Sequence, residues 1–238
     1  MLTTIRSTGV TRTAPLEARL QSFAPLKPLD LELLRTCCED LKGAPAGTEI
    51  LAPGAGREHP RLVVSGWAAA ARALPDGRRQ ILQIFLPGDV LGVTSVTKAG
   101  AVALSNVTTT DARPLTAAFA AQDPAHAGLR LAWERAVSER ELQLLDQIVR
   151  LGRLSAYERT AHLLMELMTR HRQAGLSDGR RMPWPLTQET LADVLGLSVV
   201  HVNRILQQLR RESMIQLRSG QMVVPDLQRL AAVAVWDA

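Results

Sequence analysis

The side chains that could do chemistry gather in one short segment of the chain, residues 186–211. Residues 198–211 contain three arginines and no acidic residue. An arginine can donate two hydrogen bonds to the edge of a guanine, and asparagine or glutamine can pair with adenine in the same way. We therefore interpret Asn203, Arg204 and Gln207 as candidate readers of DNA bases.

The neighbouring side chains suit the rest of a DNA surface. Val199 or Val200 could contact a thymine methyl group. Ser198, Arg210, Arg211 and the free amides at a helix start are better placed for phosphates, which position a protein without reading sequence. The predicted DNA-binding residues are Thr187, Gln188, Ser198, Val199, Val200, His201, Asn203, Arg204, Gln207, Gln208, Arg211 and Arg218.

Two helices and a tight corner must position these side chains. Thr187 is a predicted N-cap of a helix over residues 188–195, and Ser198 caps a second helix over 199–211. Gly196 can adopt the positive φ that the corner needs, and the small Ala192 lets the helices approach. The pattern predicts a helix-turn-helix; an ordinary helical hairpin is the alternative.

A β-hairpin is expected directly after the second helix. Residues 214–217 and 222–224 are apolar strands around the turn at 218–221. Such a hairpin is the wing of a winged helix, with Arg218 at its tip beside a DNA phosphate or simply in solvent.

The first half of the chain has a different pattern of apolar and turn-forming residues. Short apolar helices broken by Pro25 and Pro28 extend to about residue 43. Turn signals then alternate with short apolar runs as far as about residue 116, which predicts an antiparallel β sandwich or barrel. The expected strands are 49–51, 61–65, 68–73, 80–85, 90–91 and 102–110.

A long helix over about residues 125–152 should connect the two halves, because this stretch holds no proline and only Gly128 and Gly152 near its ends. An apolar stripe along it suits a two-stranded coiled coil, so we predict a dimer helix. The alternative is that this stripe packs on the β domain, which would make Arg140 a rim residue. The predicted dimer residues are Trp133, Val137, Arg140, Leu144, Ile148 and Leu151.

Composition limits the remaining function classes. The 238 residues suffice for two packed domains, and a charge of +5 with a pI near 10.0 suits a polyanionic partner. No apolar run is long enough for a membrane span and the start lacks a secretion signal, so we expect a cytoplasmic protein without membrane contact. Cys37 and Cys38 are adjacent, so a disulfide between them would be strained. We interpret them as buried apolar groups, with a redox sensor as the alternative.

With the two halves in this order, the chain resembles the superfamily of the cyclic-AMP receptor protein and the FNR oxygen regulator over about residues 20–230. The resemblance is carried by Gly77-Arg78-Arg79-Gln80-Ile81-Leu82, by Phe85-Leu86-Pro87-Gly88-Asp89-Val90-Leu91-Gly92, and most specifically by residues 186–198. It implies an α+β chain with a β-roll sensor domain over 1–124, a dimerisation helix over 125–152 and a winged helix-turn-helix domain over 153–238. It also implies a homodimer on a palindromic double-stranded DNA site and, for an activator, contact with RNA polymerase.

The departures from the resemblance bear on the effector. Members that bind cyclic nucleotides carry a glutamate and, about ten residues later, an arginine, whereas this chain reads Gly92-Val93-Thr94-Ser95 and then Ala103-Leu104-Ser105. Without either charged anchor we predict no tight binding of cyclic AMP or cyclic GMP. The cysteine cluster of the oxygen sensors is also missing, and His59 is the only histidine of the β half, so we expect no metal site and no cofactor. The effector remains unidentified.

The DNA surface also departs from that of relatives, which carry Arg-Glu after the serine where this chain has Val199 and Val200. Arg204 matches the arginine position of the family, but the two valines lead us to expect a different target sequence. The alternative function is a small-molecule sensor that acts through protein contacts rather than DNA. An enzyme is not expected, because the polar residues of the β half form no catalytic arrangement.

Overall fold

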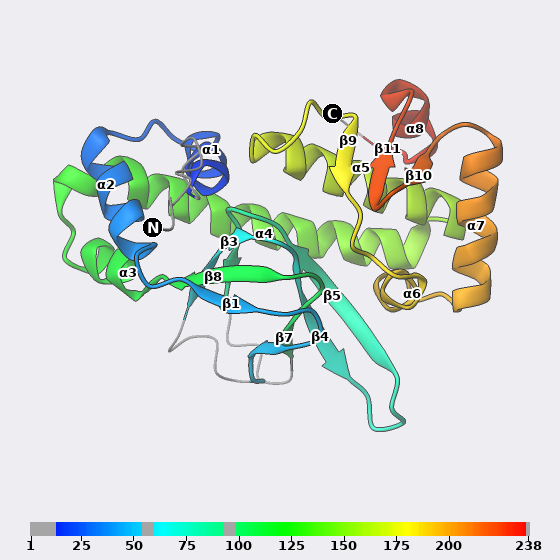
Figure 1. Ribbon diagram of the computed structural model, residues 1–238, viewed down its shortest axis with the longest axis horizontal. Coiled ribbons are helices and arrows are strands. Elements are labelled where there is room, and N and C mark those ends of the chain that lie inside the picture. The colour runs from blue at the N-terminus through cyan, green and yellow to red at the C-terminus, as the bar shows by residue number, and fades with distance from the viewer. Residues whose placement is uncertain (1–12, 54–59, 93–98, 237–238) are drawn as a thin grey trace, which may run out of the picture.

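The computed structural model describes residues 13–53, 60–92 and 99–236. Its N-terminal part contains two antiparallel β-sheets and several helices, and a smaller domain with its own sheet lies at the other end (Figure 1). The long helix α4 (Ala127–Arg153) runs past both parts, as the sequence predicts. Mixed helix and sheet in this order confirm the predicted α+β fold class.

The two large sheets form the β half. One has the order β1-β8-β3-β6 and the other β2-β7-β4-β5, with all pairs antiparallel. The strands are β1 (Lys42–Ala44), β2 (Glu49–Leu51), β3 (Arg61–Ser65), β4 (Ala68–Ala73), β5 (Arg79–Phe85), β6 (Val90–Leu91), β7 (Gly100–Ala103) and β8 (Val107–Asp111).

Side chains on β3 point alternately to the two faces of its sheet, which explains why the β half has two apolar cores. Val63 packs with Phe85 between the sheets, whereas Leu62 and Val64 on either side of it pack under the helices. The helical layer consists of α1 (Ala14–Gln21), α2 (Pro28–Cys37), α3 (Arg113–Ala120), the 3-10 helix η1 (Pro124–His126) and the start of α4.

The predicted strand over 102–110 is two strands in different sheets. The chain turns between β7 and β8, and Asn106 lies so close to Gly66 that a Cβ on this glycine would be 2.1 Å from the Asn106 carbonyl oxygen. Gly66 also has a φ of +78°, so the turn between β3 and β4, which packs against Asn106, depends on glycine. The apolar run at 102–110 does not reveal that its first residues join one sheet and its last residues the other.

The C-terminal part is a winged helix-turn-helix. Its elements are α5 (Ala156–Gln173), β9 (Arg181–Pro183), α6 (Gln188–Leu195), α7 (Val199–Arg211), β10 (Gln216–Arg218), β11 (Gln221–Val223) and α8 (Leu227–Val233), with the sheet order β10-β11-β9. Ser219 and Gly220 both have positive φ, as a two-residue turn between twisted strands requires. Strands β1 and β9 were not predicted from the sequence, because neither has an alternating apolar pattern.

One apolar core joins the two parts. Ile81, Ile84 and Leu86 of the β half lie in the same cluster as the buried residues of α5 and α6. None of the helices in the described ranges is long and apolar enough to cross a membrane.

Candidate nucleic-acid interface

The helix-turn-helix is built as its sequence predicts. The Thr187 hydroxyl accepts the amide of Thr190 at 3.1 Å and caps α6, and the Ser198 hydroxyl accepts the amide of His201 at 3.2 Å and caps α7. Gly196 has a φ of +63° and its amide donates to the Ala192 carbonyl, which closes the corner between the helices.

One face of α7 is buried and the opposite face is open. The buried face consists of Val202, Ile205, Leu206 and Leu209, which are at most 4% exposed. The exposed fraction of Val200 is 71%. The helix therefore rests on the domain core and leaves its polar side free.

The three predicted base readers lie together on this open face. Asn203, Arg204 and Gln207 are all exposed, and the Gln207 amide donates to the Asn203 side-chain oxygen at 3.2 Å. Within the described part of the chain, the Arg204 guanidinium has no hydrogen bond or ion pair. A planar donor group with no protein partner is available to a base edge.

The other predicted DNA-binding residues surround these three. Thr187, Ser198, Val199, Val200, His201, Arg211 and Arg218 are exposed, while Gln188 and Gln208 are half-buried. Gln208 already donates to Glu212 at 2.9 Å, which makes it the least available of the set.

A groove separates the helix-turn-helix from the wing. It has a volume of about 310 Å³, and its lining includes Thr187 and Gln188 at the start of α6, Arg210 of α7 and Arg218 of the wing. Gln221 also lines this groove and was not among the predicted contacts. Its position opposite Arg218 in the hairpin was the signal that could have indicated it.

The predicted dimer residues divide by burial. Trp133 is 9% exposed and packs on Phe119 with ring centroids 5.8 Å apart, so it belongs to the core of its own chain. Val137, Leu144 and Leu151 are half-buried, and only Ile148, at 66%, is largely exposed.

Arg140 packs on strand β5 of its own chain. Its Nε donates to the Gln83 side chain at 2.8 Å, and its guanidinium carbon lies 5.3 Å from the centre of the Phe85 ring. Burial lowers the pKa of Arg140, with the Asp89 charge opposing that effect. Arg140 therefore lies against the β half of its own chain.

Sequence analysis missed a second apolar stripe on α4. Leu142, Leu145 and Val149 are 59%, 53% and 53% exposed at helical spacing, and Leu131 and Ile148 extend the surface. A helix with two apolar faces does not reveal from its sequence which face the domain covers.

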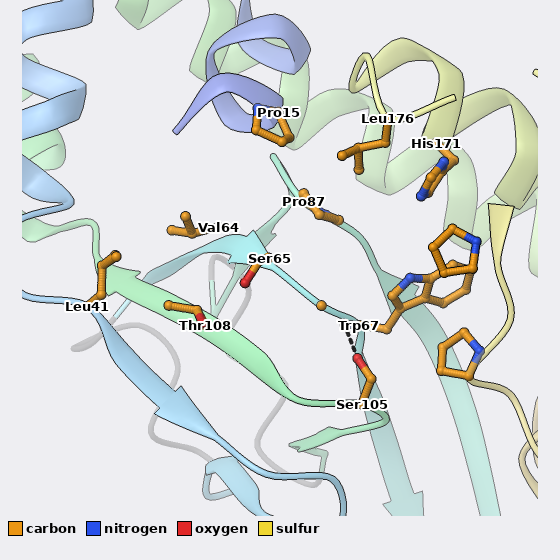
Figure 2. A pocket seen from close by; sticks show the side chains of 13 residues that line it. Pro15, Leu41, Val64, Ser65, Trp67, Pro87, Ser105, Thr108, His171 and Leu176 are labelled. Atoms are coloured by element: carbon orange, nitrogen blue, oxygen red, sulfur yellow. Dashed lines mark hydrogen bonds between the residues drawn. The ribbon is translucent and has the colours of Figure 1, made fainter. Parts of the chain in front are cut away.

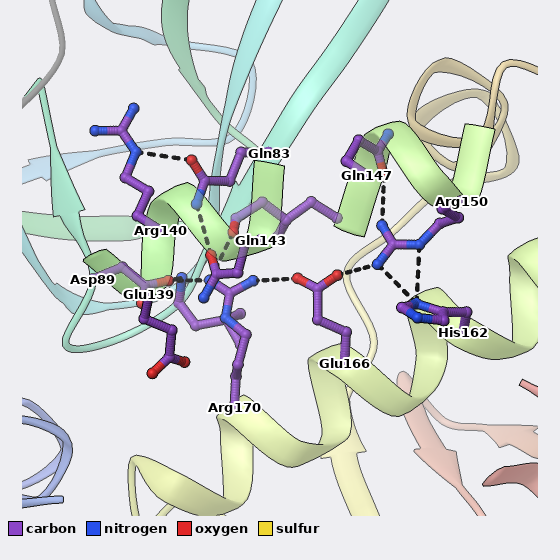
Figure 3. A network of polar contacts seen from close by, with 12 residues as sticks. Gln83, Asp89, Glu139, Arg140, Gln143, Gln147, Arg150, His162, Glu166 and Arg170 are labelled. Atoms are coloured by element: carbon purple, nitrogen blue, oxygen red, sulfur yellow. Dashed lines mark hydrogen bonds and ion pairs between the residues drawn. The ribbon is translucent and has the colours of Figure 1, made fainter. Parts of the chain in front are cut away.

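A buried polar network holds the domains together. The Glu166 carboxylate accepts hydrogen bonds from Arg150 and Arg170, and Arg170 also bonds Asp89 and, at 2.8 Å, the Ile84 carbonyl (Figure 3). These side chains come from α4, α5 and the β5–β6 loop. They connect the β half to the helix-turn-helix part.

Charge complementarity stabilises this network. Burial alone would raise the pKa of Glu166, but the charges of Arg150 and Arg170 and their hydrogen bonds outweigh it and lower the pKa. Burial and the Arg150 charge both lower the pKa of the adjacent His162. Glu166 therefore stays ionised, and His162 favours its neutral form.

The end of α6 is held by other elements. The Val194 carbonyl accepts from Gln147 at 2.7 Å and from Gln80 at 3.2 Å, and the Leu195 carbonyl accepts from Arg159 at 2.8 Å. Carbonyls at a helix end otherwise lack partners, so these bonds fix the orientation of α6 on the rest of the protein.

Metal or thiol chemistry in the described ranges would depend on their histidine, cysteine and acidic side chains. No group of three or more histidine, cysteine or acidic side chains there could hold a metal ion. Cys37 and Cys38 are buried, and burial, with smaller effects of neighbouring charges, raises the pKa of each thiol to about 11. His59 and Val93-Thr94-Ser95 lie outside the described residues.

Comparison with known proteins agrees with this architecture. The family model of the Crp-like helix-turn-helix domain matches residues 158–233. The nitrogen fixation regulation protein FixK of Rhizobium meliloti is 30% identical over 188 residues, which cover 74% of this chain and 78% of that protein. The transcriptional activator protein FnrL of Cereibacter sphaeroides is 32% identical over 208 residues, covering 81% and 79%.

A solved structure gives the same result. The structure of FixK2 from Bradyrhizobium japonicum superimposes with a TM-score of 0.70 at 28% identity and covers 84% of this chain and 98% of its own. A β-sheet domain joined to a winged helix-turn-helix with an open cationic helix defines a DNA-binding transcription regulator. The chain belongs to the Crp/Fnr family of such regulators.

Proposed function

We propose that the protein works as a homodimer that reads a palindromic DNA site through α7, with Arg204 as its main base contact. The observation that carries this proposal is the strip of Asn203, Arg204 and Gln207, which stands exposed on a helix whose opposite face is fixed in the core. Two such helices related by a twofold axis would occupy successive major grooves about 34 Å apart. The proposal assigns sensing to residues 1–124, dimerisation to 125–152 and DNA binding to 153–238.

Selection of bound fragments from genomic DNA, followed by gel shifts on the selected site, tests this proposal. Arg204→Ala should cost roughly 1–3 kcal/mol of binding free energy and relax the preference at one base position in each half-site. Arg218→Ala, at the wing, is the matched control. It should weaken all sequences alike and reduce the salt dependence. Unchanged sequence preference in Arg204→Ala would contradict the assignment of α7 as the reading helix.

We infer that the dimer forms through the exposed stripe of Leu142, Leu145 and Val149 rather than through the buried stripe of α4. Exposed leucines and valines at helical spacing suit a two-helix seam. Leu145→Glu should turn the dimer into a monomer in analytical ultracentrifugation. Leu29→Glu, on the 47% exposed Leu29 of α2, should leave the dimer intact.

The proposal includes an effector other than a cyclic nucleotide. The cavity inside the β half has a volume of only about 90 Å³ and is lined mainly by apolar side chains such as Leu51, Phe85 and Leu91. Small-molecule sites usually offer roughly 300–1,000 Å³. Arg140 is the one charged residue among the described lining residues; its Nε donates to Gln83, and one of its terminal nitrogens is buried without a partner among the described residues. Micromolar binding of cyclic AMP in calorimetry would overturn this part of the proposal.

The sign of regulation is proposed from the relatives. FnrL is named a transcriptional activator, so we propose that this protein also activates transcription by contacting RNA polymerase. Transcription in vitro from a template with the selected site should rise when the protein is added. A fall in transcript would show repression instead.

A further inference from the structure

The side chain of Arg159 joins three elements at the base of the helix-turn-helix. Its Nη1 donates to the Leu195 carbonyl at 2.8 Å, and its Nη2 donates to the Leu151 carbonyl at 3.0 Å and to the Leu154 carbonyl at 3.2 Å. Leu195 is the last residue of α6, Leu151 lies in the last turn of α4, and Leu154 follows α4 directly. One planar donor group therefore bonds the end of α6 to the end of the long helix.

An arginine suits this place for electrostatic and geometric reasons. Carbonyls in the last turn of a helix have no partner within the helix, and the helix dipole gives them a partial negative charge. A guanidinium holds its donors in a fixed plane, so the carbonyls that it bonds are held in a fixed relation to each other. All three hydrogen-bond partners of Arg159 in the described part of the chain are carbonyls, and no carboxylate there pairs with it.

The chain beside these bonds is a short extended connection between two helices. Leu154 has φ −82° and ψ 142°, and Ser155, the N-cap of α5, has φ −62° and ψ 162°. Because a few non-helical residues can absorb a large change in the angle between two helices, this connection alone would not fix the position of α5 relative to α4. The bond from Arg159 to the Leu154 carbonyl restrains it.

The corner between α6 and α7 rests on the same group. A Cβ on Gly196 would lie 3.5 Å from the Leu151 side chain and 3.9 Å from a terminal nitrogen of Arg159. Gln147 also holds α6, by donating to the Val194 carbonyl at 2.7 Å, but it does so from within α4. Arg159 is therefore the side chain that bonds α6, α4 and the connection between α4 and α5 together.

Packing on another side of the helix-turn-helix part is incomplete. A cavity of about 640 Å³ separates β3 and β8 of the β half from the end of α5 and from Pro183 and Pro185, which lead to α6 (Figure 2). A cavity supplies no contacts between the walls that it separates. The tilt of the helix-turn-helix part therefore depends on the bonds at the end of α4 as well as on the shared apolar core.

We propose that Arg159 is a positioning residue that sets the distance between the two α7 helices of the dimer, and thereby the spacing of half-sites that the protein accepts. This inference rests on the proposed function as a homodimer on a palindromic site. Helix α7 has 13 residues, so its far end lies about 20 Å from the corner. A rotation of about 10° at the corner moves that end by about 3.5 Å, which is the rise of about one base pair.

Distances between two spin labels test the hold of Arg159 on α6 without DNA. One label is attached to Glu134→Cys on α4 and the other to Val200→Cys on α7; both positions are exposed, and the two native cysteines are buried. An excess of unlabelled chain ensures that pairs within one chain dominate. The parent should give one narrow distance distribution, and Arg159→Met should broaden or shift it by at least about 3 Å. An unchanged distribution would show that Gln147 and the apolar core suffice, and would overturn the inference.

Arg153→Met is the matched control. Arg153 is exposed in the last turn of α4 and forms no hydrogen bond or ion pair with the described residues. The control loses the same charge from the same region, so it should keep the distance distribution and the DNA binding of the parent. A change in Arg153→Met as large as that in Arg159→Met would show a general effect of charge and overturn the assignment to Arg159.

Gel shifts on the selected palindrome test the consequence for DNA. A spacer lengthened or shortened by one base pair should weaken binding of the parent at least about tenfold, because it shifts and rotates one half-site relative to the other. In Arg159→Met at least one of these changes should cost less than about threefold, while affinity for an isolated half-site stays as in the parent. Equal spacer sensitivity in the two proteins overturns the inference. So does a loss by the same factor on every site, which a merely structural role would give.

Failure of the proposed function has a different signature. If the parent prefers no DNA sequence, the proposed interface is wrong, and the label distances alone decide whether Arg159 positions α7. Thermal unfolding followed by circular dichroism verifies that each variant is folded. If Arg159→Met is not, Arg159→Lys takes its place, because a single ammonium nitrogen then replaces the two nitrogens that reach different helices. The same two outcomes overturn the inference in that variant.

Discussion

Replacing Glu166 by glutamine should destabilise the protein more than any comparable change of a surface carboxylate. Glu166 is 7% exposed and lies between two guanidinium groups, those of Arg150 and Arg170, which are themselves 2% and 3% exposed. Asp89 is the remaining acidic partner of Arg170. Glu166→Gln keeps the shape of the side chain but leaves Arg150 without an acidic partner among the described residues.

The size of the effect follows from burial. Removing one partner of a buried ion pair typically costs about 3–5 kcal/mol, because the other charge stays desolvated and uncompensated. The matched control is Glu134→Gln. Glu134 lies 4.0 Å from Arg130 in an exposed pair with side chains 63% and 40% exposed, and such pairs contribute about 0.5 kcal/mol or less.

Urea unfolding followed by circular dichroism measures both variants. The midpoint should fall strongly for Glu166→Gln and barely for Glu134→Gln, with an unchanged slope m if unfolding stays two-state. A loss in Glu166→Gln of less than about 1 kcal/mol would refute the claim that this network holds the domains together. A changed m would instead show that the two halves now unfold separately.

Further outcomes concern the corner, the buried histidine and the thiols. Gly196→Ala should cost about 1–2 kcal/mol in urea unfolding through its positive φ alone, since a Cβ would lie 3.5 Å from Leu151, an ordinary contact. Burial on folding lowers the pKa of His171 to about 4, so between about pH 6.5 and pH 4 only the unfolded chain binds this proton. The free energy of unfolding should therefore fall by about 2 kcal/mol more in the parent than in His171→Phe when the pH is lowered from about 7.5 to 5. Parallel stability curves for the two proteins would contradict this. Burial is the main cause that raises the pKa values of Cys37 and Cys38 to about 11. Both thiols should therefore react with iodoacetamide on the order of a hundredfold more slowly than glutathione, as followed by mass spectrometry. Rapid alkylation would favour a redox role.

The helix-turn-helix was predictable because its determinants are local. The caps Thr187 and Ser198 bond amides three residues away, and Gly196 closes its turn on Ala192. The apolar spacing of α7 then fixes which side faces the core. Contacts within a few residues leave a pattern that sequence alone contains.

The packing of the long helix α4 and the pairing of the sheets were predicted less well because their determinants are distant in sequence. The sequence predicts Trp133 and Ile148 on the same apolar stripe of the long helix. In the structure Phe119 packs on Trp133, whereas Ile148 is exposed. Asp89 stood out in the sequence only as part of the segment that carries the family resemblance, whereas the fold brings it to Arg170, 81 residues away. Neither pairing has a periodic signal.

The contacts between the two halves differ in strength, and this indicates where a signal to α7 would pass. Arg79 and Asp193 form an ion pair at 2.6 Å, but their side chains are 41% and 26% exposed, so the pair contributes at most about 1 kcal/mol. Ile81 and Ile84, on the same strand, are 1% and 3% exposed in the core shared with α6. Full burial of each such side chain is worth about 1.5–3 kcal/mol. A displacement of β5 would therefore move α6 mainly through this apolar contact and through the Gln80 side chain, which donates to the Val194 carbonyl, and α7 would follow because it packs directly on α6.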